Sequence, residues 1–68
     1  MCGIIGINSN KSVSATIINS LKKLEYRGYD SAGIATLSNG LINEVKSEGR
    51  VDNLEKNSLV QNMEGTIG

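Results

Sequence analysis

The Asn-Gly dipeptide near the middle of the chain constrains the fold more than any other feature of the sequence. It stands between two apolar runs, in Ser38-Asn39-Gly40-Leu41. A two-residue type I′ turn needs positive φ at both central positions, and Asn followed by Gly accepts that backbone at low steric cost. The dipeptide therefore predicts a hairpin that pairs residues 32–38 with residues 41–47 and places Leu37 opposite Ile42.

The register of this hairpin also assigns a second apolar pair and a polar face. Ile34 is expected to face Val45. Side chains alternate between the two faces of a strand, so charged residues spaced two apart share one face. We expect this wetter face of the second strand to carry Glu44, Lys46 and Glu48.

Residues 12–27 precede the hairpin and have the apolar spacing of an amphipathic helix. The apolar stripe consists of Val13, Ile17, Ile18, Leu21 and Leu24. Because these residues recur at helical spacing, they lie on one side of the helix. Ser12 is the expected N-cap and Gly28 the expected left-handed stop. The cations that suit the C-terminal end of the helix dipole are Lys22, Lys23 and Arg27.

Weaker signals flank these two elements. Residues 2–7 predict a short buried strand, whose glycines suit the close approach of another backbone or a ligand. Asp52 is expected to begin a second helix, with Glu55 completing a capping box. The sparse apolar face of that helix consists of Leu54, Leu59 and Met63. Residues 65–68 predict the opening of another strand, so the whole order indicates an α+β fold or part of a layered α/β/α body.

The composition excludes several kinds of functional site. The chain has no His, which excludes a His-based metal site and a Ser-His-Asp triad within it. Its single cysteine allows neither an internal disulfide nor a cysteine zinc site. Seven basic and seven acidic residues balance, which argues against a nucleic-acid partner. Without staples, a core of this size seldom supplies more than about 3–5 kcal/mol, so the chain is expected to belong to something larger or to be marginally stable alone.

Signals for export or membrane insertion are missing from the sequence. The early apolar stretch, residues 2–7, is too short for a signal-peptide core and has no basic leader. No segment approaches the roughly 20 apolar residues of a membrane span. We therefore expect a cytoplasmic protein without a membrane partner, in which a free thiol stays reduced.

Cys2 is the most pointed chemical feature, because it directly follows Met1. Removal of Met1 would leave a free α-amine beside the thiol, and the pKa of an α-amine, about 7.7–8, suits a general base. The thiol is nucleophilic, so an N-terminal cysteine supplies nucleophile and base without a His. The alternative is that Cys2 is a small buried apolar residue of the first strand.

A polar loop joins the predicted helix to the hairpin, with the sequence Tyr26-Arg27-Gly28-Tyr29-Asp30. One interpretation is a rigid loop beside the strand that carries Cys2. The other is a helix stop in which Arg27 and Asp30 pair locally. The loop is not a phosphate-binding loop, because its glycine spacing lacks the Lys-Ser/Thr that this chemistry needs.

A resemblance to the glutamine–fructose-6-phosphate aminotransferases, or glucosamine-6-phosphate synthases, is carried by two segments. They are Met1-Cys2-Gly3-Ile4-Ile5-Gly6 and Leu24-Glu25-Tyr26-Arg27-Gly28-Tyr29-Asp30-Ser31-Ala32-Gly33-Ile34-Ala35. The opening Cys-Gly-Ile is shared by class II glutamine amidotransferases generally, whereas the loop 26–30 resembles the amino-sugar enzymes specifically. The resemblance extends over essentially all 68 residues and covers only the beginning of that longer enzyme.

The resemblance implies both a fold and a mechanism. The family fold is a four-layer α/β/β/α sandwich of the N-terminal-nucleophile hydrolase type, of which residues 1–68 would form the N-terminal part. Cys2 would attack the side-chain amide of glutamine, release ammonia and leave a glutamyl-thioester, from which water then releases glutamate. Arg27 and Gly28 would lie beside this nucleophile and help to shape its site. No individual role is implied for Tyr26, Tyr29 or Asp30.

The resemblance also implies what the parent protein does with the ammonia. A separate sugar isomerase domain would use it to convert fructose 6-phosphate to glucosamine 6-phosphate, without a cofactor, in an enzyme expected to be a homo-oligomer. The residues that bind the glutamine carboxylate and form the oxyanion hole would follow Gly68, so the isolated chain is expected to be inactive. Asn39-Gly40 is a turn and not that oxyanion hole.

Two other hypotheses stay open from the sequence. The chain could be the start of another class II amidotransferase. It could also be a complete small binding module without enzymatic activity, or a decayed remnant of an enzyme.

Overall fold

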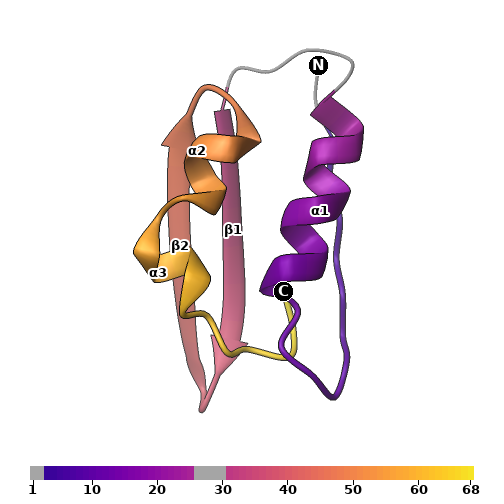
Figure 1. The fold of residues 1–68 in the computed structure, drawn as a ribbon. Coiled ribbons are helices and arrows are strands. Elements are labelled where there is room, and N and C mark those ends of the chain that lie inside the picture. The colour runs from indigo at the N-terminus through magenta and orange to yellow at the C-terminus, as the bar shows by residue number, and fades with distance from the viewer. Residues whose placement is uncertain (1–2, 26–30) are drawn as a thin grey trace.

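Three helices lie over one face of a two-stranded antiparallel sheet in the described part of the chain (Figure 1). The structure is a computed structural model that describes residues 3–25 and 31–68. Its elements are α1 (Ser14–Leu24), β1 (Ser31–Ser38), β2 (Leu41–Glu48), α2 (Val51–Glu55) and α3 (Ser58–Gln61). This is an α+β arrangement, as the order of the predicted elements indicates.

The predicted hairpin is confirmed in its turn and in its register. Asn39 has a φ of 53° and Gly40 a φ of 77°, the positive pair that a type I′ turn needs. Leu37 pairs with Ile42, as the turn predicts. The second predicted pair is present as well, with Ile34 opposite Val45.

The two faces of this hairpin differ in their cover. Ile34, Thr36 and Val45 lie on the face toward the helices and are buried. Leu37 and Ile42 lie on the opposite face, because side chains alternate along a strand, and there 37% of Leu37 and 73% of Ile42 are exposed. The predicted polar residues are exposed on that same opposite face, namely Glu44, Lys46 and Glu48.

The core forms where α1 and α2 meet the covered face of the sheet. Its buried apolar residues are Val13, Ile17, Ile18, Ile34, Val45, Val51, Leu54, Val60 and Met63. Leu54 has an exposed fraction of 0%, because α2 contacts α1 and both strands. The predicted apolar stripe is confirmed at its first three positions, which are buried, and Leu21 is partly buried against the core, whereas Leu24 at the helix end is 38% exposed.

α1 begins without the predicted cap. Its N-cap residue is Val13, which makes no side-chain capping bond. The prediction of Ser12 as N-cap is wrong, because the Ser12 hydroxyl donates instead to the carbonyl oxygen of Met63 at 3.0 Å. The described helix ends at Leu24, and the predicted stop at Gly28 lies outside the described residues.

The single helix predicted from Asp52 is two short helices, α2 and α3. Arg50 is the N-cap of α2 and its own side chain makes no capping hydrogen bond, so the predicted capping box of Asp52 and Glu55 is wrong. Asn57 separates the helices, and its side chain starts α3 by accepting a hydrogen bond from the Leu59 N–H at 2.8 Å. This restart leaves 66% of Leu59 exposed, so the prediction that it shares one apolar face with Leu54 and Met63 is wrong for Leu59.

The two ends of the described chain pair with each other beside β1. The Ile7 N–H donates to the carbonyl oxygen of Gly68 at 2.8 Å, and the Gly68 N–H donates to that of Ile7 at 2.9 Å. Ile67 bridges Asn8 on one side and Leu37 of β1 on the other. The strand opening predicted at residues 65–68 is therefore present as these bridges, between the N-terminal segment and β1.

The buried strand predicted at residues 2–7 is wrong for residues 3–7. These residues are not assigned to a strand, and 94% of Ile4 is exposed. Ile5 and Ile7 are only partly buried against the core. A strand needs a paired neighbour along its length, and among the described residues only the end of this segment has one.

Candidate functional site

The predicted catalytic residues border the described part of the chain. Cys2 and the loop 26–30, which contains Arg27 and Gly28, lie outside the described residues. Their described neighbours along the chain are Gly3, Glu25 and Ser31. The structure therefore describes the residues on either side of the predicted nucleophile and loop.

The two neighbourhoods that carry the predicted chemistry meet at the end of α1. Gly3 lies against the side chain of Leu24, the last residue of that helix. A Cβ atom built on Gly3 would stand 2.7 Å from Leu24 Cδ1, closer than real side chains approach. The residue next to Cys2 thus contacts the helix end that leads into the loop 26–30. Glycine permits such a close approach, which is the sequence signal for this contact.

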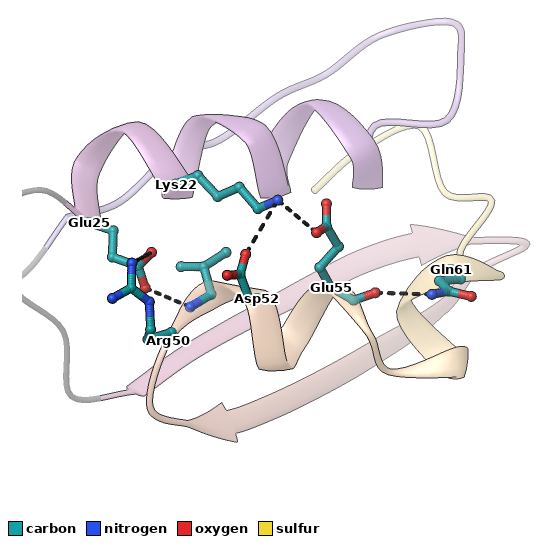
Figure 2. A network of polar contacts seen from close by, with 7 residues as sticks. Lys22, Glu25, Arg50, Asp52, Glu55 and Gln61 are labelled. Atoms are coloured by element: carbon teal, nitrogen blue, oxygen red, sulfur yellow. Dashed lines mark hydrogen bonds and ion pairs between the residues drawn. The ribbon is translucent and has the colours of Figure 1, made fainter.

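Glu25 anchors the end of α1 to the start of α2 (Figure 2). Its side chain is 10% exposed, and its Oε2 accepts a hydrogen bond from the Val51 N–H at 2.7 Å. The first N–H groups of a helix lack partners within the helix and favour a negative charge, so this carboxylate caps α2. Arg50 Nη2 lies 3.8 Å from Oε1 of the same carboxylate. These two contacts therefore hold Glu25, which is the residue directly before the loop 26–30.

Lys22 joins the same two helices nearer the middle of α1 (Figure 2). Its Nζ donates to Glu55 Oε1 at 2.7 Å and lies 3.5 Å from Asp52 Oδ1. The hydrogen bond to Glu55 raises the pKa of Lys22 above its usual value of 10.5. The contacts of Glu25 and Lys22 could not be predicted from the sequence, because their partners lie far along the chain.

A small cavity lies next to Gly3, between α1 and β1, with a volume of about 120 Å³. Its walls come from residues 3–5, from Ile17 and Leu21 of α1, and from residues 33–35 of β1. None of these residues has an ionisable side chain. The cavity cannot perform acid–base chemistry by itself, so the predicted chemistry depends on Cys2.

Two kinds of feature are missing from residues 3–25 and 31–68. No group of three or more His, Cys, Asp or Glu side chains is placed there to hold a metal ion. No helix in these ranges is both long and apolar enough to span a bilayer.

Comparison with known proteins gives one consistent result. The chain is 53% identical over 68 residues to the glutamine–fructose-6-phosphate aminotransferase (isomerizing) of Brucella abortus biovar 1 (strain 9-941). It is 48% identical to the protein of that name from Rhizobium meliloti (strain 1021), and 47% identical to the one from Mesorhizobium japonicum. By sequence, the chain matches the N-terminal part of a glutamine–fructose-6-phosphate aminotransferase.

The match covers all of this chain and a small part of each relative. It includes 100% of the 68 residues and 11% of the length of the aminotransferases from Brucella and Rhizobium. The resemblance carried by two segments of the sequence is thereby confirmed along the whole chain. No family model and no solved structure matches the chain.

Proposed function

We propose that this chain is the N-terminal part of the glutamine-hydrolysing domain of a glutamine–fructose-6-phosphate aminotransferase. The observation that carries the proposal is the match over all 68 residues to proteins of that name, at 53% identity for the Brucella abortus protein. The contact of Gly3 with Leu24 adds support, because it draws the Cys2 end of the chain toward the helix that leads into loop 26–30.

The proposed reaction starts at Cys2 after removal of Met1. The α-amine of Cys2 accepts the thiol proton, and the thiolate attacks the side-chain amide carbon of glutamine. The resulting ammonium returns the proton to the leaving nitrogen, so that ammonia departs and a glutamyl-thioester remains. Water then attacks the thioester carbon, and its proton passes through the same amine to the sulfur as glutamate leaves.

Arg27 and Gly28 have a supporting role in the proposed site. Both belong to the loop that starts directly after Glu25, and Glu25 itself is held by the hydrogen bond from the Val51 N–H. We assign them the shaping of the glutamine pocket and no proton transfer. Residues that follow Gly68 would hold the substrate carboxylate and the oxyanion, so the 68-residue chain alone is expected to release no ammonia from glutamine.

The proposal includes the four-layer α/β/β/α sandwich of the N-terminal-nucleophile hydrolases. The face of the sheet opposite the helices carries Leu37, Ile42 and Ile67, which are 37%, 73% and 43% exposed. Apolar side chains gathered on one face of a sheet are normally covered by another layer. In the proposed arrangement a second sheet covers the part of this face that carries Leu37, Ile42 and Ile67, whereas the charged residues of the same face stay at its margin. The three described helices form an outer layer.

The whole enzyme would pass the ammonia to fructose 6-phosphate and form glucosamine 6-phosphate. This step belongs to a sugar isomerase domain beyond the 68 residues, in a cytoplasmic homo-oligomer. Glutamine and fructose 6-phosphate are the small-molecule partners of this proposal, and no cofactor enters the steps at Cys2.

The test measures glutamate and glucosamine 6-phosphate formation by the protein expressed with its complete reading frame. We expect Cys2→Ala to abolish both products. A matched control inserts Lys between Met1 and Cys2, which keeps the thiol but prevents removal of Met1. Loss of activity in this control as well would identify the free α-amine as the base, because the thiol is still present.

The remaining hypotheses give different results in the same assay. Glutamate without glucosamine 6-phosphate would indicate another class II amidotransferase with a different acceptor. If a folded protein whose N-terminus is Cys2 forms neither product, the chain would belong to a binding module or to a remnant of an enzyme. Full activity in the Lys insertion would contradict the proposed base.

A further inference from the structure

Both ends of the loop 26–30 are attached to one corner of the fold, residues 48–51, which joins β2 to α2 (Figure 1). Before the loop, Glu25 Oε2 accepts a hydrogen bond from the Val51 N–H at 2.7 Å. After the loop, Ser31 begins β1 and pairs with Glu48. The two attachment points are the two ends of the corner, so this short segment sets the spacing of the residues that flank the loop.

The corner 48–51 is itself held by its backbone and by the core. Gly49 has a φ of 87°, a conformation that is strained for residues with a side chain. A Cβ built on Gly49 would also stand 3.0 Å from Asn53 Nδ2. Val51 is 5% exposed and belongs to the core, so the N–H group that bonds Glu25 is carried by a packed residue. The corner therefore offers both flanking residues a fixed attachment.

Glu25 connects α1 to this corner at the residue from which the loop starts. It is the C-cap residue of α1, and its N–H group still bonds to carbonyl oxygens of that helix. Its side chain is 10% exposed and has the Val51 N–H and the Arg50 guanidinium as partners (Figure 2). A carboxylate largely removed from water needs such partners, so the side chain is directed to the corner.

We propose that Glu25 is a positioning residue for glutamine hydrolysis, because its bond to Val51 sets where the loop 26–30 leaves α1. This inference rests on the proposed function, which places Arg27 and Gly28 in the glutamine pocket. Glu25 acts through the loop and does not touch the substrate. Without its bond, only a fraction of the molecules keeps the arrangement that binds glutamine, and the apparent affinity falls by that fraction.

The first measurement is the steady-state kinetics of glutamate release by the protein expressed with its complete reading frame. We expect Glu25→Ala to raise the KM for glutamine about tenfold. At saturating glutamine the binding-competent form is refilled, so kcat should change less than about threefold. The KM for fructose 6-phosphate should not change. A merely structural role would lower the amount of folded enzyme, which reduces the apparent kcat and moves neither KM.

Two conservative variants at the same position identify the interaction responsible. Glu25→Gln keeps an acceptor oxygen for the Val51 N–H, so its KM for glutamine should rise less than about threefold. Glu25→Asp keeps the charge but is one methylene shorter, so it should raise the KM more than Glu25→Gln does. Should Glu25→Ala fail to fold, the comparison of these two variants decides, and a larger rise in Glu25→Gln would overturn the inference.

Variants elsewhere separate the corner from the general contact between α1 and α2. Gly49→Ala strains the corner without touching Glu25, so it should also raise the KM for glutamine. Lys22→Met is the matched control, because it removes the bond from Lys22 Nζ to Glu55 at 2.7 Å between the same helices and leaves the corner intact. An unchanged KM in Glu25→Ala, or an equal rise in Lys22→Met, would overturn the inference.

The second measurement is limited proteolysis by trypsin, which needs no substrate. Cleavage after Arg27 follows the population of molecules in which that part of the chain is open, so its rate reports how firmly the loop is held. We expect cleavage in Glu25→Ala to be at least about fivefold faster than in the unmodified protein, and cleavage in Lys22→Met to be unchanged. Equal rates in Glu25→Ala and the unmodified protein would overturn the inference.

Together the two measurements distinguish this inference from the proposed function. If the unmodified protein forms glutamate and Glu25→Ala changes neither the KM nor the cleavage rate, the inference alone is overturned. If the unmodified protein forms no glutamate, the proposed function is overturned, and the use of Glu25 in glutamine hydrolysis is overturned with it. Faster cleavage of Glu25→Ala would then still support the attachment of the loop to the corner.

Discussion

Replacement of Glu25 tests whether a carboxylate from α1 really holds the start of α2. In Glu25→Ala the Val51 N–H loses its partner at 2.7 Å, and the capping of α2 is lost with it. Hydrogen bonds to charged groups contribute about 1.5–3 kcal/mol, and helix caps about 0.5–2 kcal/mol. Both ranges describe the same bond from the Val51 N–H to the Glu25 carboxylate, so they are not added.

The ion pair with Arg50 adds little to this magnitude. Arg50 Nη2 stands 3.8 Å from the carboxylate and its side chain is 59% exposed, so solvent screening limits the pair to a few tenths of a kcal/mol. We therefore expect Glu25→Ala to lower the free energy of unfolding by about 1.5–2.5 kcal/mol. Glu25→Gln keeps an acceptor oxygen and loses the charge, so its loss should be about half as large.

The assay is urea denaturation of the 68-residue chain followed by far-UV circular dichroism. Glu44→Ala is the matched control, because Glu44 is an exposed carboxylate whose ion pair with Lys46 spans 4.0 Å. Its effect should stay below about 0.5 kcal/mol. If Glu25→Ala and Glu44→Ala lower the free energy of unfolding by the same amount, the capping of α2 by Glu25 is not a stabilising interaction.

Three further predictions follow from the core and the charged contacts. Leu54→Ala should lower the free energy of unfolding by about 2–5 kcal/mol, because Leu54 is fully buried. Leu59→Ala, at a residue 66% exposed, should change it by less than about 0.5 kcal/mol. Equal losses of unfolding free energy in urea denaturation would contradict the core described above. Thr36→Val should raise the melting temperature, because the Thr36 hydroxyl is buried without a hydrogen-bond partner among the described residues; a lower value would show that it has one. The bond to Glu55 raises the pKa of Lys22, so the stability that this bond contributes is complete below pH 10.5 and is lost as the pH rises through the folded-state pKa. Above pH 10.5 the urea midpoint of the unmodified chain should therefore fall more than that of Lys22→Met. Equal falls in the two midpoints would refute this prediction.

The hairpin shows how far local sequence reasoning reaches in this chain. The Asn39-Gly40 turn is a property of two adjacent residues, because few residue types accept positive φ in succession. Once the turn is placed, covalent geometry sets the pairing of Leu37 with Ile42 and of Ile34 with Val45. The turn does not determine which face of the hairpin the helices cover. They cover the face that carries Ile34 and Val45, and they leave Leu37 and Ile42 exposed.

The helix ends show where local reasoning stops. Ser12 and Asp52 both have the side chain of an N-cap, yet neither one caps its helix. The Ser12 hydroxyl bonds to the carbonyl of Met63, and the start of α2 is capped by Glu25, 26 residues away. A cap is decided by whichever polar group arrives at the helix end, and distant segments deliver that group only in the folded chain.

The candidate site divides in the same way. The prediction that Cys2 is a nucleophile follows from its place after Met1 and from its residue type, and both can be recognised without coordinates. The contact of Gly3 with Leu24 could be recognised only in part, because the glycine signals a close approach by some other segment, but nothing in the spacing of the two residues identifies Leu24 as the partner.

The sequence by itself determined the turn, the register of the hairpin and the apolar side of α1, since each depends on a few neighbouring residues and on fixed backbone periodicity. Only the tertiary structure decided which sheet face is covered, where the helix after β2 breaks, and that the N-terminal segment pairs with residues 66–68. These outcomes depend on packing between segments far apart in the chain, where burial and hydrogen bonding with a distant partner outweigh local preference.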